Sequence, residues 1–179
     1  MRCPSTYTID KMIRTSLLIL FFAVCGVCSG QPINKRYSTY LSSNGTIYFF
    51  NPKKLTKRVN ADRFTYDMTY ISHGDSVTVN CSVEVKENSM IKQMVMKNAN
   101  KSYLGKSVSM LYRDVMKNGY LLRITSKFSI LDITEMFQSS TPLIFEFTLT
   151  DGTRCILTYS ESQWKKESHD VSRIIESLN

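Results

Sequence analysis

The chain has few of the residues from which enzyme sites are usually built. Its 179 residues include only two histidines, His73 and His169, and no grouping of His, Cys and carboxylate residues at the spacing of a zinc site. A glycine-rich phosphate loop, a Gly-x-Ser-x-Gly elbow and a His-Glu-x-x-His helix are also missing. The run from Ser72 to Asp75 holds the residue types of a hydrolase triad, but neighbours in a tight turn do not converge on one substrate atom. We therefore expect no metal, no cofactor and no catalytic residue of these classes.

One acidic residue leaves an enzymatic alternative open. Glu146 faces Leu157 in the strand pairing that we predict below, and an apolar setting would raise the pKa of its carboxyl and suit a general acid. A carboxylate-based hydrolase would need a second acidic residue within about 5–10 Å of Glu146. The competing interpretation is an ion pair between Glu146 and a Lys or Arg at the edge of the sheet. The leading hypothesis is a non-catalytic protein, and a small secreted hydrolase is the alternative.

Apart from residues 15–30, the chain has no long apolar run. Arg14 precedes the apolar core of this run, and the small residues at 28–30 end it. This order is typical of a secretory signal, and the core is shorter than the roughly 20 residues of a membrane-spanning helix. We expect residues 1–30, or a shorter signal starting at Met12, to be removed on export to the periplasm or the cell exterior. A retained signal anchor is the alternative.

Cysteine is scarce in the expected mature chain. Of the five cysteines, Cys3, Cys25 and Cys28 lie in the segment to be removed, where lipid attachment at Cys25 or Cys28 is a further alternative. Cys81 and Cys155 remain, each inside a predicted strand. In an oxidising compartment they can form a disulfide, which would close a loop of about 75 residues and contribute roughly 2–4 kcal/mol. The alternative is two separately buried thiols.

Acidic residues are nearly absent from residues 31–63. Asp62 is the only one there, against Lys35, Arg36, Lys53, Lys54, Lys57, Arg58 and Arg63. Basic residues interspersed with aromatic ones can bind an anionic partner. We predict that the partner is a protein or a glycan, and nucleic acid is not expected for an exported protein. The predicted contacts are Lys53, Lys54, Lys57, Arg58, Tyr48 and Phe50.

Strict alternation of apolar and polar residues predicts a β-hairpin over residues 64–85. A two-residue turn at His73-Gly74 sets the register of the two strands. The predicted pairs are Tyr70 with Val77, Met68 with Val79, Tyr66 with Cys81 and Phe64 with Val83. This register places all the apolar residues on one face, and a slip by one residue would separate them.

A second hairpin is predicted over residues 142–159, with its turn at Asp151-Gly152. Pairing Thr150 with Thr153 distributes the apolar residues over both faces. One face holds Leu143, Phe145, Phe147, Leu149 and Ile156, and the other holds Ile144, Cys155, Leu157 and Tyr159. Because both faces are largely apolar, we expect this hairpin inside a sheet or beneath a helix.

Helical patterns occupy the end and the middle of the chain. Ser160 and Gln163 form a capping box before a C-terminal apolar stripe of Trp164, Val171, Ile174, Ile175 and Leu178. Residues 107–118 favour a second helix, and a hairpin turning at Asn118-Gly119 is the alternative. Asp132 with Glu135 indicates a short helix over residues 133–139.

These patterns predict an α+β fold: a mainly antiparallel sheet built from the hairpins at 64–85 and 142–159, with the C-terminal amphipathic helix packed on it. An all-β immunoglobulin-like sandwich is the alternative. We expect residues 31–179 to form a single mature domain, in which the basic, aromatic segment 31–63 precedes the globular part 64–179.

The expected function is binding of a protein or glycan in the cell envelope or outside the cell. Three Asn-x-Ser/Thr patterns, at Asn44, Asn80 and Asn100, would be glycosylation acceptors if the source organism makes such glycans.

Overall fold

The computed structural model describes residues 36–178 apart from 56, 60–62 and 100. The side chains of residues 57–59 also lie outside the description. All described residues belong to one compact unit, which runs from Ile33 to Asn179. The expected signal segment, with Cys3, Cys25 and Cys28, lies outside the described residues.

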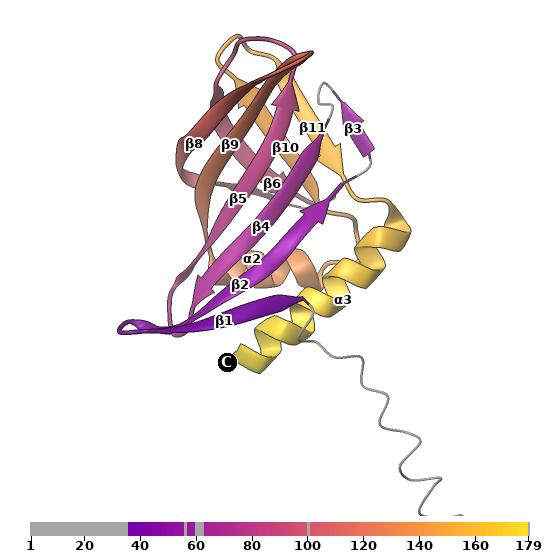
Figure 1. Cartoon of the computed structure of the whole chain (residues 1–179). Coiled ribbons are helices and arrows are strands. Elements are labelled where there is room, and N and C mark those ends of the chain that lie inside the picture. Colours follow the sequence, from indigo (N-terminus) through magenta and orange to yellow (C-terminus); the bar gives the residue numbers. More distant parts are fainter. Residues whose placement is uncertain (1–35, 56, 60–62, 100, 179) are drawn as a thin grey trace, which may run out of the picture. The chain divides into compact units, whose positions relative to one another are not determined.

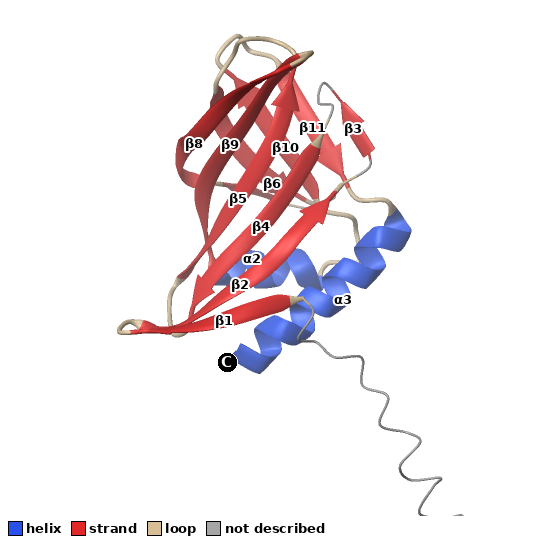
Figure 2. Cartoon of the chain, viewed as in Figure 1, coloured by secondary structure: helices blue, strands red, loops and turns tan. Residues whose placement is uncertain are grey.

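Two antiparallel sheets make up most of this unit (Figure 1). The first sheet has the order β1 (Tyr37–Ser42), β2 (Gly45–Lys54), β4 (Phe64–Ile71), β5 (Ser76–Val85), β9 (Gly119–Ser129) and β8 (Lys106–Met116). The second sheet has the order β3 (Lys57–Val59), β11 (Arg154–Thr158), β10 (Ile144–Leu149), β6 (Ile91–Lys97) and β7 (Ser102–Leu104). Helices α2 (Ile130–Gln138) and α3 (Glu161–Leu178) lie at one end of the sheets (Figure 2). The fold is thus of the mainly β, α+β class that the sequence predicts.

The core lies between the two sheets. Phe64 of β4 packs against Phe145 and Phe147 of β10 with ring centroids 5.1 and 5.8 Å apart, and Tyr66 lies 4.9 Å from Phe145. Tilted ring pairs of this kind stabilise the folded protein by more than the burial of their apolar area alone would. The inward-facing residues of β4, β5, β9, β10 and β11 therefore form one contiguous apolar layer.

The β4–β5 hairpin has the predicted register. Phe64 pairs with Val83, Tyr66 with Cys81, Met68 with Val79 and Tyr70 with Val77. Those eight side chains are all buried, whereas the alternating polar residues remain partly exposed apart from buried Glu84. At the turn, His73 adopts a positive φ of 62°.

The predicted register of the β10–β11 hairpin is wrong by one residue. Gly152 has a φ of 86°, Asp151 does not have a positive φ, and the Leu149 amide donates to the Thr153 carbonyl at 2.9 Å. This is a three-residue loop closed by a left-handed glycine, not the two-residue turn that we expected. As a result Phe145 pairs with Leu157 and Glu146 with Ile156, so Phe145, Phe147, Cys155 and Leu157 share the buried face. The hairpin does lie inside its sheet, because β6 pairs with the other side of β10.

Residues 107–118 form a strand, so the predicted helix is wrong and the hairpin alternative is right. Strand β8 pairs with β9 from Met116 opposite Gly119 to Lys106 opposite Lys127. Gly119 has a φ of 156°, and a Cβ there would lie 2.2 Å from the Val85 carbonyl oxygen. Gly119 is thus needed for a close approach between β9 and the end of β5.

Helix α2 begins three residues earlier than predicted. Its N-cap is Ser129, whose hydroxyl accepts from the Asp132 amide at 3.0 Å. Glu135, which we had assigned to the capping box, instead forms an ion pair with Lys101 at 2.6 Å. The serine at the end of β9 therefore turns the chain directly from strand into helix.

Helix α3 matches its prediction. The Gln163 amide donates to the Ser160 hydroxyl at 3.3 Å, and the Ser160 amide donates to Gln163 Oε1 at 3.4 Å, which is the reciprocal capping box. Trp164 is 2% exposed, and its indole nitrogen donates to the Ser139 carbonyl at 2.9 Å. The rest of the stripe is also buried, except half-buried Leu178.

Candidate functional site

The two aromatic residues predicted to bind a ligand belong to the core. Phe50 is buried, and Tyr48 is half-buried with its ring 5.9 Å from Tyr37 and 6.3 Å from Tyr70. Both side chains point to the inner face of β2. The Phe50 ring therefore packs in the core, and the Tyr48 ring packs between Tyr37 and Tyr70 on the same face of the sheet.

The predicted basic contacts are divided between the sheets. Lys53 and Lys54 end β2 in the first sheet, whereas Lys57 and Arg58 lie on β3 and pair with β11 in the second. Lys53 already has a partner, because its ammonium lies 3.4 Å from Glu167 Oε2. Lys54 is exposed, and the side chains of Lys57 and Arg58 are outside the description. The site formed by these four basic residues therefore stays a prediction.

Glu167 is the centre of a buried polar cluster that sequence reasoning missed. Its carboxylate forms an ion pair with Arg36, and the Tyr66 hydroxyl donates to its Oε1 at 3.3 Å. The Tyr66 hydroxyl also contacts that of Tyr159 inside the core. Arg36 Nε in turn lies 3.3 Å from Asp170 Oδ2. This cluster joins α3 to β4 and to the residue that precedes β1.

Burial dominates the electrostatics of the cluster. It raises the pKa of the Glu167 carboxyl above its usual range, while Arg36 opposes the shift. It also raises the pKa of Tyr66 and of Tyr159, which therefore remain neutral hydroxyls and hydrogen-bond donors. Every polar group named here has a partner within the protein, so the cluster links α3 to β4 and to the residue before β1.

Glu146 does not have the environment of a general acid. It lies on the outer face of the second sheet, where the Arg154 guanidinium donates to it at 2.8 Å and Lys97 forms an ion pair with it. The Lys97 ammonium, together with Arg154, lowers the pKa of the Glu146 carboxyl. The expected raised pKa is wrong, and the competing ion-pair interpretation is right.

Cys81 and Cys155 are both buried thiols, and no disulfide joins them. Cys81 lies on β5 between Tyr66 and Ile124, and Cys155 lies on β11 opposite Phe147. Burial raises the pKa of the Cys155 thiol to about 11 and raises that of Cys81 as well. A protonated thiol is a poor nucleophile, so both residues pack as small apolar groups.

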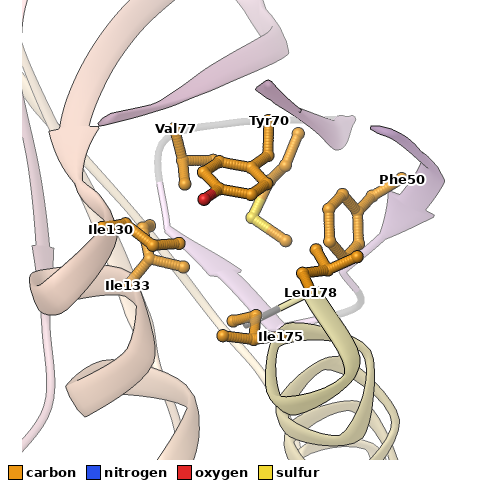
Figure 3. Close-up of a pocket in the computed structure, with 8 residues that line it drawn as sticks. Phe50, Tyr70, Val77, Ile130, Ile133, Ile175 and Leu178 are labelled. Atoms are coloured by element: carbon orange, nitrogen blue, oxygen red, sulfur yellow. The ribbon is translucent and has the colours of Figure 1, made fainter. Parts of the chain in front are cut away.

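A small apolar cavity lies where the helices meet the first sheet (Figure 3). Its volume is about 10 Å³, which is room for no more than about one water molecule. The lining consists of Phe50, Met68, Tyr70, Val77, Ile130, Ile133, Ile175 and Leu178. This cavity is a packing gap between α2, α3 and the sheet, and it cannot hold a small-molecule ligand.

The exposed feature that does stand out is an apolar group on the outer face of β1, β2 and β4. Tyr40, Ile47 and Ile71 lie in one row across the three strands, and Phe49 follows Ile47 on the same face of β2. Tyr40 is 63% exposed, Phe49 42% and Ile71 39%, while Ile47 is half-buried. We call Tyr40, Ile47, Phe49 and Ile71 the arm face, because they lie on or directly beside the β1–β2 hairpin, whose turn projects from the sheet in Figure 1.

The middle of that sheet face, across β4, β5 and β9, carries a polar network. Arg123 donates to Asp67 at 2.6 Å and to Ser82 at 2.9 Å, and Asn80 donates to Asp67 at 2.7 Å. The Asn80 amide is therefore engaged within the sheet, whereas Asn44 lies in the exposed β1–β2 turn and Asn100 is outside the described residues. The arm face thus borders a polar network on the outer face of the first sheet.

Other exposed apolar residues do not form a comparable group. Met110, Leu111 and Tyr112 are exposed on β8, but all three belong to this single edge strand. The arm face draws on three neighbouring strands and can be covered by a single partner. Its signal in the sequence is the alternation of Ile47 and Phe49 with Tyr48 and Phe50, which makes both faces of β2 apolar.

Within the described parts of the chain, no three His, Cys, Asp or Glu residues come together as metal ligands. None of the described helices is both long enough and apolar enough to cross a membrane. Comparison of the chain with protein-family models, with curated proteins and with solved structures finds no match.

Proposed function

We propose that this protein is an exported, non-catalytic domain that binds another protein through the arm face. The observation that carries the proposal is the row of Tyr40, Ile47 and Ile71, which leaves large apolar side chains in water on three adjacent strands. Exposed apolar groups rimmed by polar residues are typical of protein contact surfaces. The rim here consists of serine and threonine, such as Ser38 on β1 and Thr69 on β4.

The composition of the arm face favours a protein partner over a glycan. Tyrosine and phenylalanine are enriched in the cores of protein interfaces, where they contribute a large apolar area. No charged side chain belongs to the arm face, so we expect binding through it to depend little on salt. The exposed Lys54 would add a weaker electrostatic contribution at the far end of β2.

Export is supported by the order of charged, apolar and small residues before Gln31. Removal of residues 1–30 would leave a short segment ahead of Arg36, which is held to α3 by Glu167 and Asp170. The expected product therefore begins close to the first strand. N-terminal sequencing of the protein from the native envelope or medium tests this step. A start at or near Gln31 is expected, and an intact chain found only in the cytoplasm would contradict export.

Partner binding is tested by capture with matched variants. Immobilised wild-type protein and the variants Phe49→Ser and Ile71→Ser are incubated with the native envelope or secreted fraction, and retained proteins are identified by mass spectrometry. We expect one partner to be retained by wild type and by the control Leu111→Ser, which removes an exposed apolar residue of β8. Both arm-face variants should lose it. Equal retention by all four proteins would contradict the proposed surface.

A further inference from the structure

The two sheets have four edges, and three of them are protected against pairing with another chain. Strands β3 and β7 are only three residues long. Strand β8 is long, but its pairing with β9 shifts register between Lys106 and Ser109 and again between Met110 and Tyr112. It also carries Lys106 and Arg113. Short edge strands, bulges and charges are the usual means by which sheets avoid edge-to-edge association.

Strand β1 has none of these protections. Its sequence, Tyr-Ser-Thr-Tyr-Leu-Ser, contains neither a charged residue nor proline. Its register with β2 is unbroken from Tyr37 opposite Phe50 to Ser42 opposite Gly45. Residues 38–41 are all exposed, and no other described strand pairs with the second side of β1. An open, regular, uncharged edge of this kind is a template for another strand.

We propose that β1 pairs antiparallel with β1 of a second copy of this chain, so that two six-stranded sheets join into one. Such a pair has two-fold symmetry, and each strand must be compatible with itself. Because β1 carries no charge, no antiparallel register brings like charges face to face. On β8, by contrast, pairing Arg113 with Arg113 of the second copy, or Asp114 with Asp114, opposes like charges.

The hydrogen-bond phase of β1 fixes which of its residues meet the second copy. The Asn51 amide donates to the Arg36 carbonyl at 2.9 Å, so Arg36 directs its backbone groups toward β2. Backbone direction alternates along a strand, and Ser38, Tyr40 and Ser42 therefore also bond to β2. Tyr37, Thr39 and Leu41 direct their amides and carbonyls to the open edge.

One register uses all of these outward groups. With the two-fold axis at Thr39, Thr39 faces Thr39 of the second copy and Tyr37 faces Leu41 of the second copy. This arrangement forms about six backbone hydrogen bonds, whereas moving the axis to Ser38 or Tyr40 leaves about four. The Thr39-centred register is therefore the one that we assign.

The same register covers Leu41, the most exposed apolar side chain of the β1–β2 hairpin. Leu41 is 80% exposed, and the ring of Tyr37 from the second copy would lie directly opposite it. Tyr37 is already held in place by its packing against Tyr48 and Phe50, at 5.9 and 6.4 Å. On the other side of the joined sheet, Tyr40 would lie beside Ser38 of the second copy. The two arm faces would thus lie side by side on one face of the joined sheet.

Sedimentation velocity of the full chain over a dilution series tests the pairing. We expect a monomer–dimer equilibrium whose dissociation constant does not change between low and high salt, because no charge lies at the contact. A protein that is monomeric up to its solubility limit would overturn the proposal. A dimer that dissociates in salt would also overturn it, because the contact would then involve charges.

Two substitutions at Thr39 locate the contact. Thr39→Pro removes an amide that points away from β2, so the β1–β2 ladder remains, and the dimer dissociation constant should rise at least about tenfold. Thr39→Val keeps the amide and should leave dimerisation unchanged. Circular dichroism and melting temperature establish that both variants fold. A dimer that persists unchanged in Thr39→Pro would place the interface elsewhere and overturn the proposal.

This inference goes beyond the proposed partner recognition and can fail independently of it. Loss of the dimer in Thr39→Pro concerns the edge of β1, whereas loss of a partner in Phe49→Ser concerns the face of β2. A dimer without an identifiable partner, or a partner bound by a monomer, would each overturn one proposal and leave the other standing.

Discussion

Glu167 occupies a position on α3 where the apolar stripe would otherwise continue between Trp164 and Val171. Its charge is accommodated because Arg36 and Lys53 lie beside it and the Tyr66 hydroxyl donates to it. Removing one partner of a buried ion pair leaves the other uncompensated, which costs more than the pair itself contributes. The residue therefore links the first strand to the last helix.

Replacing Glu167 with Ala should strongly destabilise the protein. Arg36 has a side chain that is only 19% exposed and would keep Asp170 as its remaining partner. We expect a loss of about 3 kcal/mol in the free energy of unfolding, measured by urea denaturation. The control Glu176→Ala removes an exposed glutamate of the same helix and should cost less than about 0.5 kcal/mol. Equal effects of the two variants would contradict the role of the cluster.

The same carboxyl should give the stability a distinctive pH dependence. Burial raises the Glu167 pKa in the folded protein above its ordinary value of 4.5, so the unfolded chain loses this proton first as the pH rises. The folded state then holds more protons than the unfolded state, and its stability falls through the window between the two pKa values. The stability of wild type relative to Glu167→Gln should therefore decline from pH 4.5 toward neutrality. A constant or growing difference in urea titrations would contradict this direction.

Trp164 anchors α3 at the end of the sheets. Its ring lies 5.4 Å from Phe137 and 5.3 Å from Tyr159, and its nitrogen is hydrogen-bonded. Trp164→Ala should cost about 3–5 kcal/mol because the cavity left behind is enclosed on several sides. Chemical denaturation measures this loss, and the exposed Leu131→Ala in α2 serves as a control with little effect. A loss below about 1 kcal/mol would show that α3 does not depend on this anchor.

At the scale of elements, Ser129 determines where β9 ends and α2 begins. Its hydroxyl is the N-cap of α2, so Ser129→Ala should reduce the free energy of unfolding by about 1 kcal/mol. Ser129→Asp retains an acceptor at the cap and should restore most of the loss. Thermal unfolding of the three proteins checks this prediction, and an unaltered melting temperature in Ser129→Ala would contradict it.

Elements with a strong local period were predictable from the sequence. The β4–β5 hairpin repeats every second residue over its whole length, and only one register places Tyr66 and Cys81 on the same face. The stripe and capping box of α3 are equally local. In both elements the pattern that buries the apolar residues is contained within one short segment.

Elements whose conformation depends on distant contacts were not predictable. Apolar residues of β8 such as Val108, Leu111 and Val115 fit a helical stripe as well as a strand, and pairing with β9 decides the outcome. The β10–β11 register depends on the backbone angle of Gly152, which a sequence does not reveal. The shift places Ile156 and Arg154 of β11, and not Leu157, on the face of Glu146, where Arg154 donates to its carboxylate and Lys97 of β6 also forms an ion pair with it.

The candidate site was predictable only in part, for a related reason. Residues 31–63 do contain β1 and β2, which carry three of the four arm-face residues, but Tyr48 and Phe50 point inward while Phe49 points outward. Which set faces the core depends on β4, the neighbour of β2. A basic segment can be recognised from the sequence alone, because charge is visible in the composition. The arm face forms only when three strands align, so the sequence does not reveal it.

At the scale of the whole molecule, the two faces of the first sheet have different roles: the inner face stabilises the fold, and the outer face carries the proposed contact surface. The inner face packs against the second sheet and the helices, and the outer face carries the arm face beside the polar network of Asp67, Asn80 and Arg123. Strand β1 of the same hairpin also provides the one regular, uncharged sheet edge among the described strands. The β1–β2 hairpin is therefore the part of the molecule through which we propose that it binds other polypeptides.

Amide hydrogen exchange of β1, resolved to single residues and recorded over a range of protein concentrations, tests this claim most directly. The amides of Tyr37, Thr39 and Leu41 point to the open edge and should exchange quickly in dilute protein and progressively more slowly as its concentration rises. Those of Ser38 and Tyr40 bond to β2 and should remain protected throughout. Fast exchange of Tyr37, Thr39 and Leu41 at every concentration, with new protection on β8 instead, would contradict the account.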